Sequence, residues 1–242
     1  MKPLYSIKKV ESKFTGPDKT RTYKLRGVQV KDHHYGVDLL GSKEVLAIAD
    51  GIVIKVVNKG VQYGTCCKVR ILHADGYQSA YYHLASGSIK VKVGDFVKAG
   101  TYIADMGKTG TATNVHLHLQ IDKGSDKTAI DPLEYALGNK ELKGLINLYD
   151  YFKVGATYKT KFNKRFRTSP KVLSTNKCKY KNLSLLAKLK AIKDKDGYAL
   201  YKVGAKITGK EFVFDDKWNY WMRTNTLYVC VYDSTGLQAE RV

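Results

Sequence analysis

The residues of this 242-residue chain that are best suited to chemistry are its six histidines. Two of them, His116 and His118, alternate with apolar residues in the segment 115–121. A two-residue period places both imidazoles on one face of an extended strand and the leucines on the other. Taken alone, this segment is compatible with a half-exposed strand that carries two surface histidines, so its meaning depends on what else the chain brings to it.

A second polar pair, His34 and Asp38, lies four positions apart, with Gly36 between them. The even offset places both side chains on the same side of an extended segment, and the glycine disfavours a helix. One imidazole from the later pair would complete a set of two histidines and one aspartate. This set is a three-ligand zinc site that leaves the fourth position open for water, as catalytic zinc sites do.

The chemistry of zinc explains why this mixture of ligands is informative. Imidazole is a good ligand for Zn²⁺, and a carboxylate offsets part of the charge while a bound water still ionises near neutral pH. The remaining imidazoles, His83 and one of the later pair, would be free to transfer protons or to stabilise an oxyanion. The sequence therefore predicts metal-assisted hydrolysis.

The elements expected around these residues are short strands. Segments 51–57, 67–72 and 78–84 are apolar and β-rich, and turn signals at 58–60 and 74–76 separate them. The Asp-Gly step in the second turn tolerates the positive φ of a hairpin, so the last two segments predict an antiparallel pair. Residues 131–137 predict a short helix that Gly138 ends. We expect a mostly β fold whose functional residues lie on strand faces and loops.

Several blocks in this region carry a resemblance to a known family. They are His34-x-x-x-Asp38, the Tyr-Tyr-His-Leu run that contains His83, and the Gly-Lys-Thr-Gly run that leads into His116-x-His118. In this order they resemble the lysostaphin-type zinc endopeptidases, which cut peptide cross-links of bacterial peptidoglycan, over about residues 28–137. The resemblance implies an antiparallel β-sheet metallopeptidase domain with a catalytic groove.

Carried over by position, the resemblance implies that His34, Asp38 and His118 hold one catalytic Zn²⁺ ion. His83 and His116 correspond to the catalytic histidines that do not bind the metal. We assign His116 as the base that deprotonates the water and His83 as a donor to the oxyanion or the leaving group, although the two roles are interchangeable at this stage.

The other histidines are left outside this set. His33 is five positions from Asp38 and would face the opposite side of an extended chain. His73 precedes the Asp-Gly turn, and we expect it to be a surface residue at a strand end. Asn114 and Val115 stand where the family often has a Gly-Pro or Ala-Pro step, a departure that concerns loop shape and not the chemistry.

The C-terminal part resembles bacterial SH3-like wall-binding domains. An Asn-x-x-x-Arg-x-x-Pro type of run opens it at 163–170, and an aromatic strand, a turn and a final strand close it. Strands are expected at 158–160, 188–192, 220–223 and 227–232. The predicted organisation is a peptidase domain at 1–140, a linker at 141–152 and a small SH3-like β-barrel at 153–242. Its aromatic residues would form the core, with a few exposed on the floor of a ligand groove.

Charge and composition define the expected partners. The chain carries 42 Lys and Arg against 22 Asp and Glu, a net charge of +20, which suits polyanions. No nucleic-acid-binding motif is present, so we expect peptidoglycan and anionic wall polymers as partners and no specific nucleic acid. No apolar run approaches the about 20 residues of a membrane span, so no stable membrane association is expected. We expect a monomer with four reduced cysteines.

The most direct interpretation is a peptidoglycan hydrolase of the endolysin type. The first 16 residues carry no apolar signal segment. We therefore expect synthesis in the cytoplasm of a bacterial host and action at the cell wall after release. The alternatives are a secreted autolysin and a non-enzymatic wall-binding regulator with the same fold. Which peptide bond is cleaved is left open.

Overall fold

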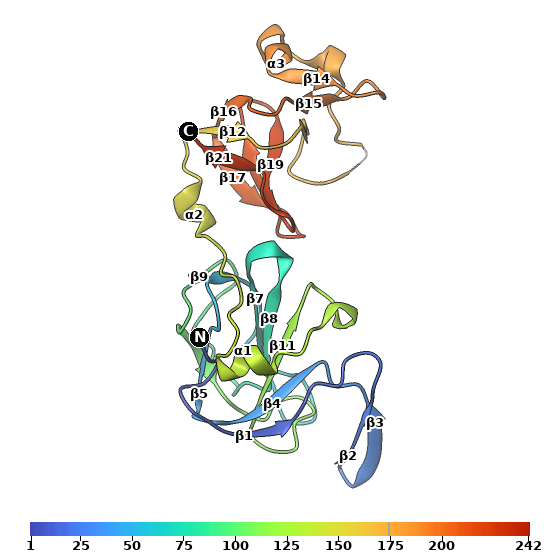
Figure 1. The fold of residues 1–242 in the computed structure, drawn as a ribbon, viewed down its shortest axis with the longest axis vertical. Helices are drawn as coiled ribbons and strands as arrows, with labels where there is room; N and C mark the ends of the chain where they lie inside the picture. Colours follow the sequence, from blue (N-terminus) through green and yellow to red (C-terminus); the bar gives the residue numbers. More distant parts are fainter. Residues whose placement is uncertain (174) are drawn as a thin grey trace. The chain divides into compact units, whose positions relative to one another are not determined.

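The computed structural model describes residues 1–173 and 175–242. The chain forms two compact units, Met1–Asn147 and Leu148–Val242. Both units are built mostly of antiparallel strands (Figure 1). The expected mostly β fold class is therefore confirmed.

The division between the units falls inside the segment predicted as linker, 141–152. That segment also contains a short helix, α2 (Leu148–Tyr151). Within the residues that the structure describes, no helix is both long enough and apolar enough to cross a membrane.

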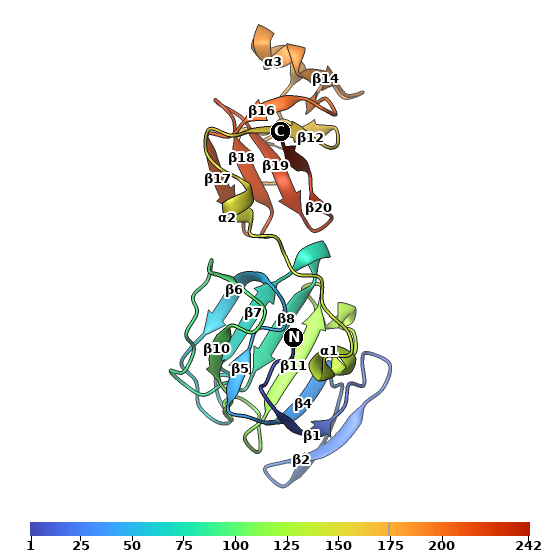
Figure 2. The ribbon, with the colours of Figure 1, turned by 60° about the vertical axis from the view of Figure 1, so that its left-hand side comes forward.

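A seven-stranded sheet in the order β1-β4-β11-β8-β7-β6-β9 forms the centre of the N-terminal unit. Figure 2 shows six of these strands side by side, in the order β1, β4, β11, β8, β7 and β6. The strands of the sheet are β1 (Ile7–Ser12), β4 (Gly36–Gly41), β6 (Gly51–Val57), β7 (Lys68–Leu72), β8 (Gln78–Tyr82), β9 (Phe96–Val97) and β11 (Leu117–Asp122). Smaller pairs and turns accompany it: β2 (Arg21–Leu25) with β3 (Val28–Asp32), β5 (Glu44–Leu46) with β10 (Tyr102–Asp105), the 3₁₀ turns η1 (Ala74–Gly76) and η2 (Asp126–Thr128), and α1 (Leu133–Leu137).

Period-two alternation decides which face of this sheet is buried. Val37 and Leu39 on β4, and Leu117 and Leu119 on β11, are fully buried in the main hydrophobic cluster. Their strand neighbours of opposite parity therefore emerge on the other face, where the polar residues gather. The alternation predicted for 115–121 is the pattern that positions the site.

The predicted hairpin is confirmed. Strands β7 and β8 pair antiparallel, with Lys68 opposite Tyr82 and Leu72 opposite Gln78. Asp75 has φ of 57° and the next glycine 75°, which is why the turn uses an Asp-Gly step. The helix predicted after residue 131 is α1, and Gly138 ends it with φ of 82°.

The described residues of the C-terminal unit form three small sheets, in the orders β16-β12-β21, β13-β15-β14 and β17-β18-β19-β20. Its strands are β12 (Thr157–Thr160), β13 (Lys164–Arg165), β14 (Ala191–Lys193), β15 (Ala199–Tyr201), β16 (Lys206–Thr208), β17 (Glu211–Phe214), β18 (Tyr220–Arg223), β19 (Tyr228–Asp233), β20 (Gly236–Leu237) and β21 (Ala239–Arg241), with the 3₁₀ turn η3 (Tyr180–Asn182). Several of its aromatic residues lie in the core: Tyr158, Phe166, Tyr201, Tyr220 and Trp221 are buried.

One predicted strand of this unit is wrong in its first half. Residues 188–192 were expected to be extended, but the helix α3 (Leu185–Leu189) occupies the start of that segment and β14 follows it. The Ser184 hydroxyl accepts a hydrogen bond from the Ala187 N–H at 3.3 Å and caps the helix. A serine cap followed by leucine, alanine and lysine favours a helix over a strand.

Candidate metal and catalytic site

Four adjacent strands of the large sheet place one residue each in a single transverse row. Ser12 on β1 is paired with Asp38 on β4, Asp38 with His118 on β11, and His118 with Tyr82 on β8. Residues that are paired across antiparallel strands point to the same face. The row therefore collects a hydroxyl, a carboxylate, an imidazole and a phenol on the polar face of the sheet.

His34 reaches this row from the segment just before β4. Its Nε2 lies 3.0 Å from Asp38 Oδ1 and 2.9 Å from His118 Nδ1, and His118 Nδ1 lies 2.9 Å from the same carboxylate oxygen. The three candidate ligand atoms all lie within 4.8 Å of one another. The structure thus brings together the residues that the sequence analysis proposes as ligands.

A backbone carbonyl fixes how the His34 ring faces the other two residues. Its Nδ1 lies 2.7 Å from the carbonyl oxygen of Lys13, so Nδ1–H donates there, and Nε2 is the nitrogen that carries the lone pair in the neutral imidazole. That lone pair faces the anionic Oδ1 of Asp38, and His34 is only 2% exposed. A proton or a metal ion between these two atoms would satisfy both of them. The donor set of two nitrogens and one oxygen fits a metal ion such as Zn²⁺.

The pKa values in the cluster suit metal binding near neutral pH. Burial alone would raise the pKa of Asp38, but hydrogen bonds with His118 and His34 overcome it and hold the pKa well below its ordinary value. Burial lowers the pKa of His118. An ionised carboxylate and a neutral imidazole are the forms that coordinate metals.

His83 and His116 lie beside the three-residue cluster, with ring centroids 4.8 Å apart. His83 Nδ1 lies 2.7 Å from Thr109 O, and His116 Nδ1 lies 3.1 Å from Asn114 O. Each ring therefore donates from Nδ1 to a carbonyl and keeps Nε2 free to accept a proton. Burial, and next the proximity of His116, lowers the pKa of His83 to about 4.

The backbone of His83 supports a functional role for its position. Its φ of 61° is in the left-handed region, which is unfavourable for a residue other than glycine. Such conformations persist where the surroundings over-determine them, and they cluster at functional sites. Here the strand β8 ends at Tyr82, and the turn directs the next side chain to Thr109.

Gly36 has a role that the sequence pattern did not reveal. A Cβ atom at this position would lie 2.3 Å from the carbonyl oxygen of Leu119 and 2.6 Å from His118 Nε2. Both distances are well below van der Waals contact. The glycine therefore leaves the space that the His118 imidazole occupies, in addition to keeping the segment out of a helix.

The two remaining histidines lie outside the site. His33 is exposed and its Nδ1 lies 2.9 Å from Lys19 O. The expectation that His73 is a surface residue is wrong, because it is fully buried. Its Nδ1 lies 2.9 Å from Asp50 O and its Nε2 lies 2.7 Å from Ser79 Oγ. The segment after α1 covers this strand end, where the Ala74 N–H donates to Lys143 O at 3.2 Å.

Arg21 and Tyr82 are site neighbours that the sequence reasoning missed. Arg21 Nη1 donates to Asp38 Oδ2 at 2.9 Å, and the Tyr82 ring packs edge-on against His118 with centroids 5.4 Å apart. Tyr82 adjoins His83 in a recognised run, so its position offered a signal. Arg21 lies before the resembling region and offered none.

Comparisons with known proteins point to one family. Residues 32–132 match the model of Peptidase family M23. The glycyl-glycine endopeptidase ALE-1 of Staphylococcus capitis is 36% identical over 139 residues, which cover 53% of this chain and 37% of that protein. The murein hydrolase activator NlpD of Escherichia coli (strain K12) is 40% identical over 103 residues, or 41% of this chain and 25% of that protein. This chain therefore matches less than two thirds of the length of either relative.

Among solved structures, the catalytic domain of the antimicrobial peptidase lysostaphin from Staphylococcus simulans is similar to the chain. The sequence identity is 31% and the TM-score is 0.43. The match covers 53% of this chain and 92% of that structure.

Proposed function

We propose that the chain, whose residues 32–132 match the model of Peptidase family M23, is a zinc-dependent endopeptidase that hydrolyses amide bonds in bacterial peptidoglycan. The observation that carries the proposal is the convergence of His34, Asp38 and His118 within 4.8 Å. The name of the relative from Staphylococcus capitis, a glycyl-glycine endopeptidase, supports a bond in the stem peptide or cross-bridge as the target.

His34 Nε2, Asp38 Oδ1 and His118 Nδ1 would hold the single zinc ion. When bound there, zinc supplies a Lewis acid that polarises a carbonyl and lowers the pKa of water. The protein contributes the fixed orientation of its ligands: the Lys13 carbonyl sets the tautomer of His34, and the sheet register sets the spacing of Asp38 and His118.

The proton is handled by the histidine pair beside the ligands. His116 Nε2 lies 3.6 Å from Asp38 Oδ1, beside the proposed ligands, and this position suits the ring to take the proton of the attacking water. A charge on His116 in turn opposes protonation of His83. The pair thus carries one proton at a time and returns it to the departing amine.

The C-terminal unit is proposed to be an SH3-like domain that holds the enzyme at the wall. A hollow in this unit is lined by aromatic, apolar and basic side chains, among them Phe166, Tyr201, Leu186, Lys190 and Lys210. Such a lining suits a peptide or an anionic polymer. Tethering raises the effective concentration of substrate at the catalytic unit without a second partner chain, so we propose a monomer.

We further propose that the protein acts as an endolysin, made in the cytoplasm of a bacterial host and active at the wall after release. Its four cysteines, Cys66, Cys67, Cys178 and Cys230, are all free thiols, which suits synthesis in a reducing compartment. A secreted autolysin with the same chemistry is the alternative setting.

A non-enzymatic role is the second candidate function, and one observation favours it. The relative from Escherichia coli is named a murein hydrolase activator and not a hydrolase. Against this role, the present chain keeps a buried His-Asp-His cluster with two more imidazoles beside it. A regulator has no need for this arrangement.

The experiment that decides is digestion of purified cell walls with identified products. Walls with glycine-rich and with direct cross-links are incubated with the protein, turbidity is followed, and new amino termini are identified by mass spectrometry. We expect turbidity loss with one class of new amino terminus, which a chelator abolishes. Walls that bind the protein but release no amino termini would support the regulator instead.

A further inference from the structure

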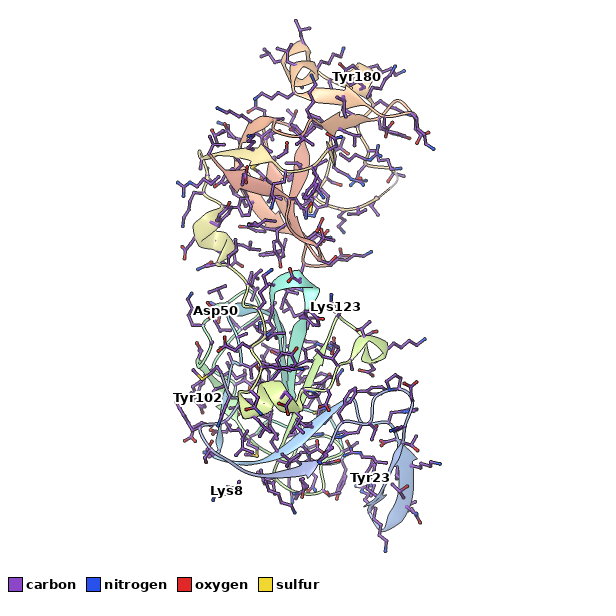
Figure 3. All side chains as sticks on the ribbon, in the orientation of Figure 1. Lys8, Tyr23, Asp50, Tyr102, Lys123 and Tyr180 are labelled. Carbon is purple, nitrogen blue, oxygen red and sulfur yellow. The ribbon has the colours of Figure 1, made fainter. Side chains whose placement is uncertain are left out.

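A hairpin that lies outside the family match except for its last residue, Asp32, reaches the candidate metal site. The family model begins at residue 32, whereas the hairpin is formed by β2 and β3, which pair from Arg21 opposite Asp32 to Leu25 opposite Val28. The label Tyr23 in Figure 3 shows where this hairpin lies. Its first residue, Arg21, donates from Nη1 to Asp38 Oδ2 at 2.9 Å.

The two oxygens of the Asp38 carboxylate face different partners. Oδ1 lies 3.0 Å from His34 Nε2 and 2.9 Å from His118 Nδ1, and Oδ2 accepts from Arg21. The side chain is only 8% exposed, so water has little access to either oxygen. One oxygen is thus directed toward the metal ligands, and the guanidinium holds the other.

Arg21 is itself held by several contacts. Its Nη1 donates to Ser12 Oγ at 2.7 Å, its Nε lies 3.6 Å from Asp32 Oδ1, and its guanidinium lies 4.9 Å from the centre of the Tyr23 ring. Ser12 Oγ also lies 3.4 Å from Nδ1 of His34. Both hydrogen bonds come from Nη1, which joins Ser12 to the Asp38 carboxylate, while the planar guanidinium lies near Asp32 and Tyr23 in a way that a lysine cannot reproduce.

We propose that Arg21 is a positioning residue for the metal site: it holds Asp38 so that the carboxylate offers Oδ1 alone as a ligand. The inference rests on the proposed zinc function. An outer partner of this kind fixes the ligand before the metal arrives, so less ordering is needed on binding. It also stops both oxygens from coordinating at once, which keeps a position open for water and substrate.

Removal of Arg21 has a definite expected effect. In Arg21→Met, Oδ2 loses a charged donor in a buried place, so the carboxylate is free to rotate and to offer both oxygens. Loss of an outer partner weakens metal binding by about 10- to 100-fold. Arg21→Lys keeps the charge but not the planar guanidinium that lies near Asp32 and Tyr23, and its loss of affinity falls between wild type and Arg21→Met.

The test measures metal binding and not hydrolysis. The full chain is stripped of metal, Zn²⁺ affinity is measured by competition with a chromophoric chelator, and Co²⁺ is added to report coordination through its visible spectrum. Arg26→Met is the matched control, because Arg26 lies at the tip of the same hairpin with its guanidinium 4.3 Å from the Tyr63 ring. Circular dichroism confirms that each variant is folded.

We expect wild type and Arg26→Met to bind Zn²⁺ equally and to give the intense Co²⁺ bands of a low-coordinate site. Arg21→Met should bind more weakly and give weaker bands, as a carboxylate with two coordinating oxygens raises the coordination number. Equal affinity in all variants overturns the inference, as does an equal loss in Arg21→Met and Arg26→Met. A wild-type chain that binds no metal contradicts the proposed function instead.

Discussion

The two units both bury polar side chains, but they satisfy them in different ways. In the C-terminal unit, buried Asp215 accepts from the Lys217 and Asn219 N–H groups and from Trp221 Nε1, all within 3.0 Å, so its hydrogen-bonding capacity is used by its own turn. In the N-terminal unit, the partners of buried Asp38 come from segments far apart in the chain: Arg21, His34 and His118. A buried polar group therefore marks a candidate metal site where its partners are themselves metal-binding side chains brought together from separate segments.

The substitution with the largest expected effect on this contrast is His118→Ala, which removes one proposed ligand from the cluster. We expect wall hydrolysis to fall by at least about 10³-fold, because the ligands act as a unit. Sedimentation with walls should be unchanged, because the proposed anchor is in the other unit. The matched control is His33→Ala, which removes an exposed histidine next in sequence to His34 and should keep wild-type hydrolysis.

His83→Gln tests whether the histidine pair acts in proton transfer without binding metal. Removal of a general acid or base lowers kcat by about 10²- to 10⁴-fold. Because His83 is outside the three-residue cluster, the variant should bind one equivalent of Zn²⁺ with wild-type affinity. Loss of zinc binding in parallel with activity would show that His83 is a ligand or supports one.

His73 provides a pH-dependent test of a buried imidazole that belongs to structure and not to the site. Burial lowers its pKa from 6.5 to about 4 in the folded protein. The unfolded chain then binds more protons between these values, so the free energy of unfolding falls as pH drops from 7 to 4 and is regained above 6.5. One pKa unit is worth about 1.4 kcal/mol, so we expect a loss of about 3 kcal/mol.

Urea unfolding of wild type and His73→Gln over this pH range isolates the effect. The variant should be less stable at pH 7 but show a shallower decline toward pH 4, because its amide does not titrate. Parallel declines in the two proteins would mean that other groups control the acid sensitivity.

The smallest effect is expected from Asp215→Asn in the C-terminal unit. An amide leaves at least one of the buried donors around it unsatisfied, at about 1 to 3 kcal/mol. Thermal unfolding should show the loss in that unit, and hydrolysis of a short soluble peptide should not change. A fall in peptide hydrolysis would contradict the separation of roles between the two units.

Much of the N-terminal fold and site was predictable because the signals are local. The two-residue period in 115–121 sets the faces of β11, and the offset of four between His34 and Asp38 places both on one side. The turn at Asp75 and the helix stop at Gly138 likewise follow from residues a few positions apart.

Most of what the sequence did not predict depends on contacts between segments far apart in the chain. His73 looks like a surface residue until the chain near Lys143 covers it, and the role of Arg21 depends on a hairpin folding toward β4. No local pattern encodes either contact. The start of α3 was missed for a different reason. The serine cap at 184 is a local helix signal, but the alternation of polar and apolar residues from 188 onward suggests a strand.

The measurement that tests the central claim most directly is zinc reconstitution of the metal-stripped protein with product formation as the readout. We expect no release of amino termini from cell walls without metal, a linear rise up to one equivalent of Zn²⁺ per chain, and a plateau beyond it. His118→Ala should stay flat throughout. Full activity in the stripped protein, or none with zinc while the chain still sediments with walls, would contradict a single catalytic zinc site built on His34, Asp38 and His118.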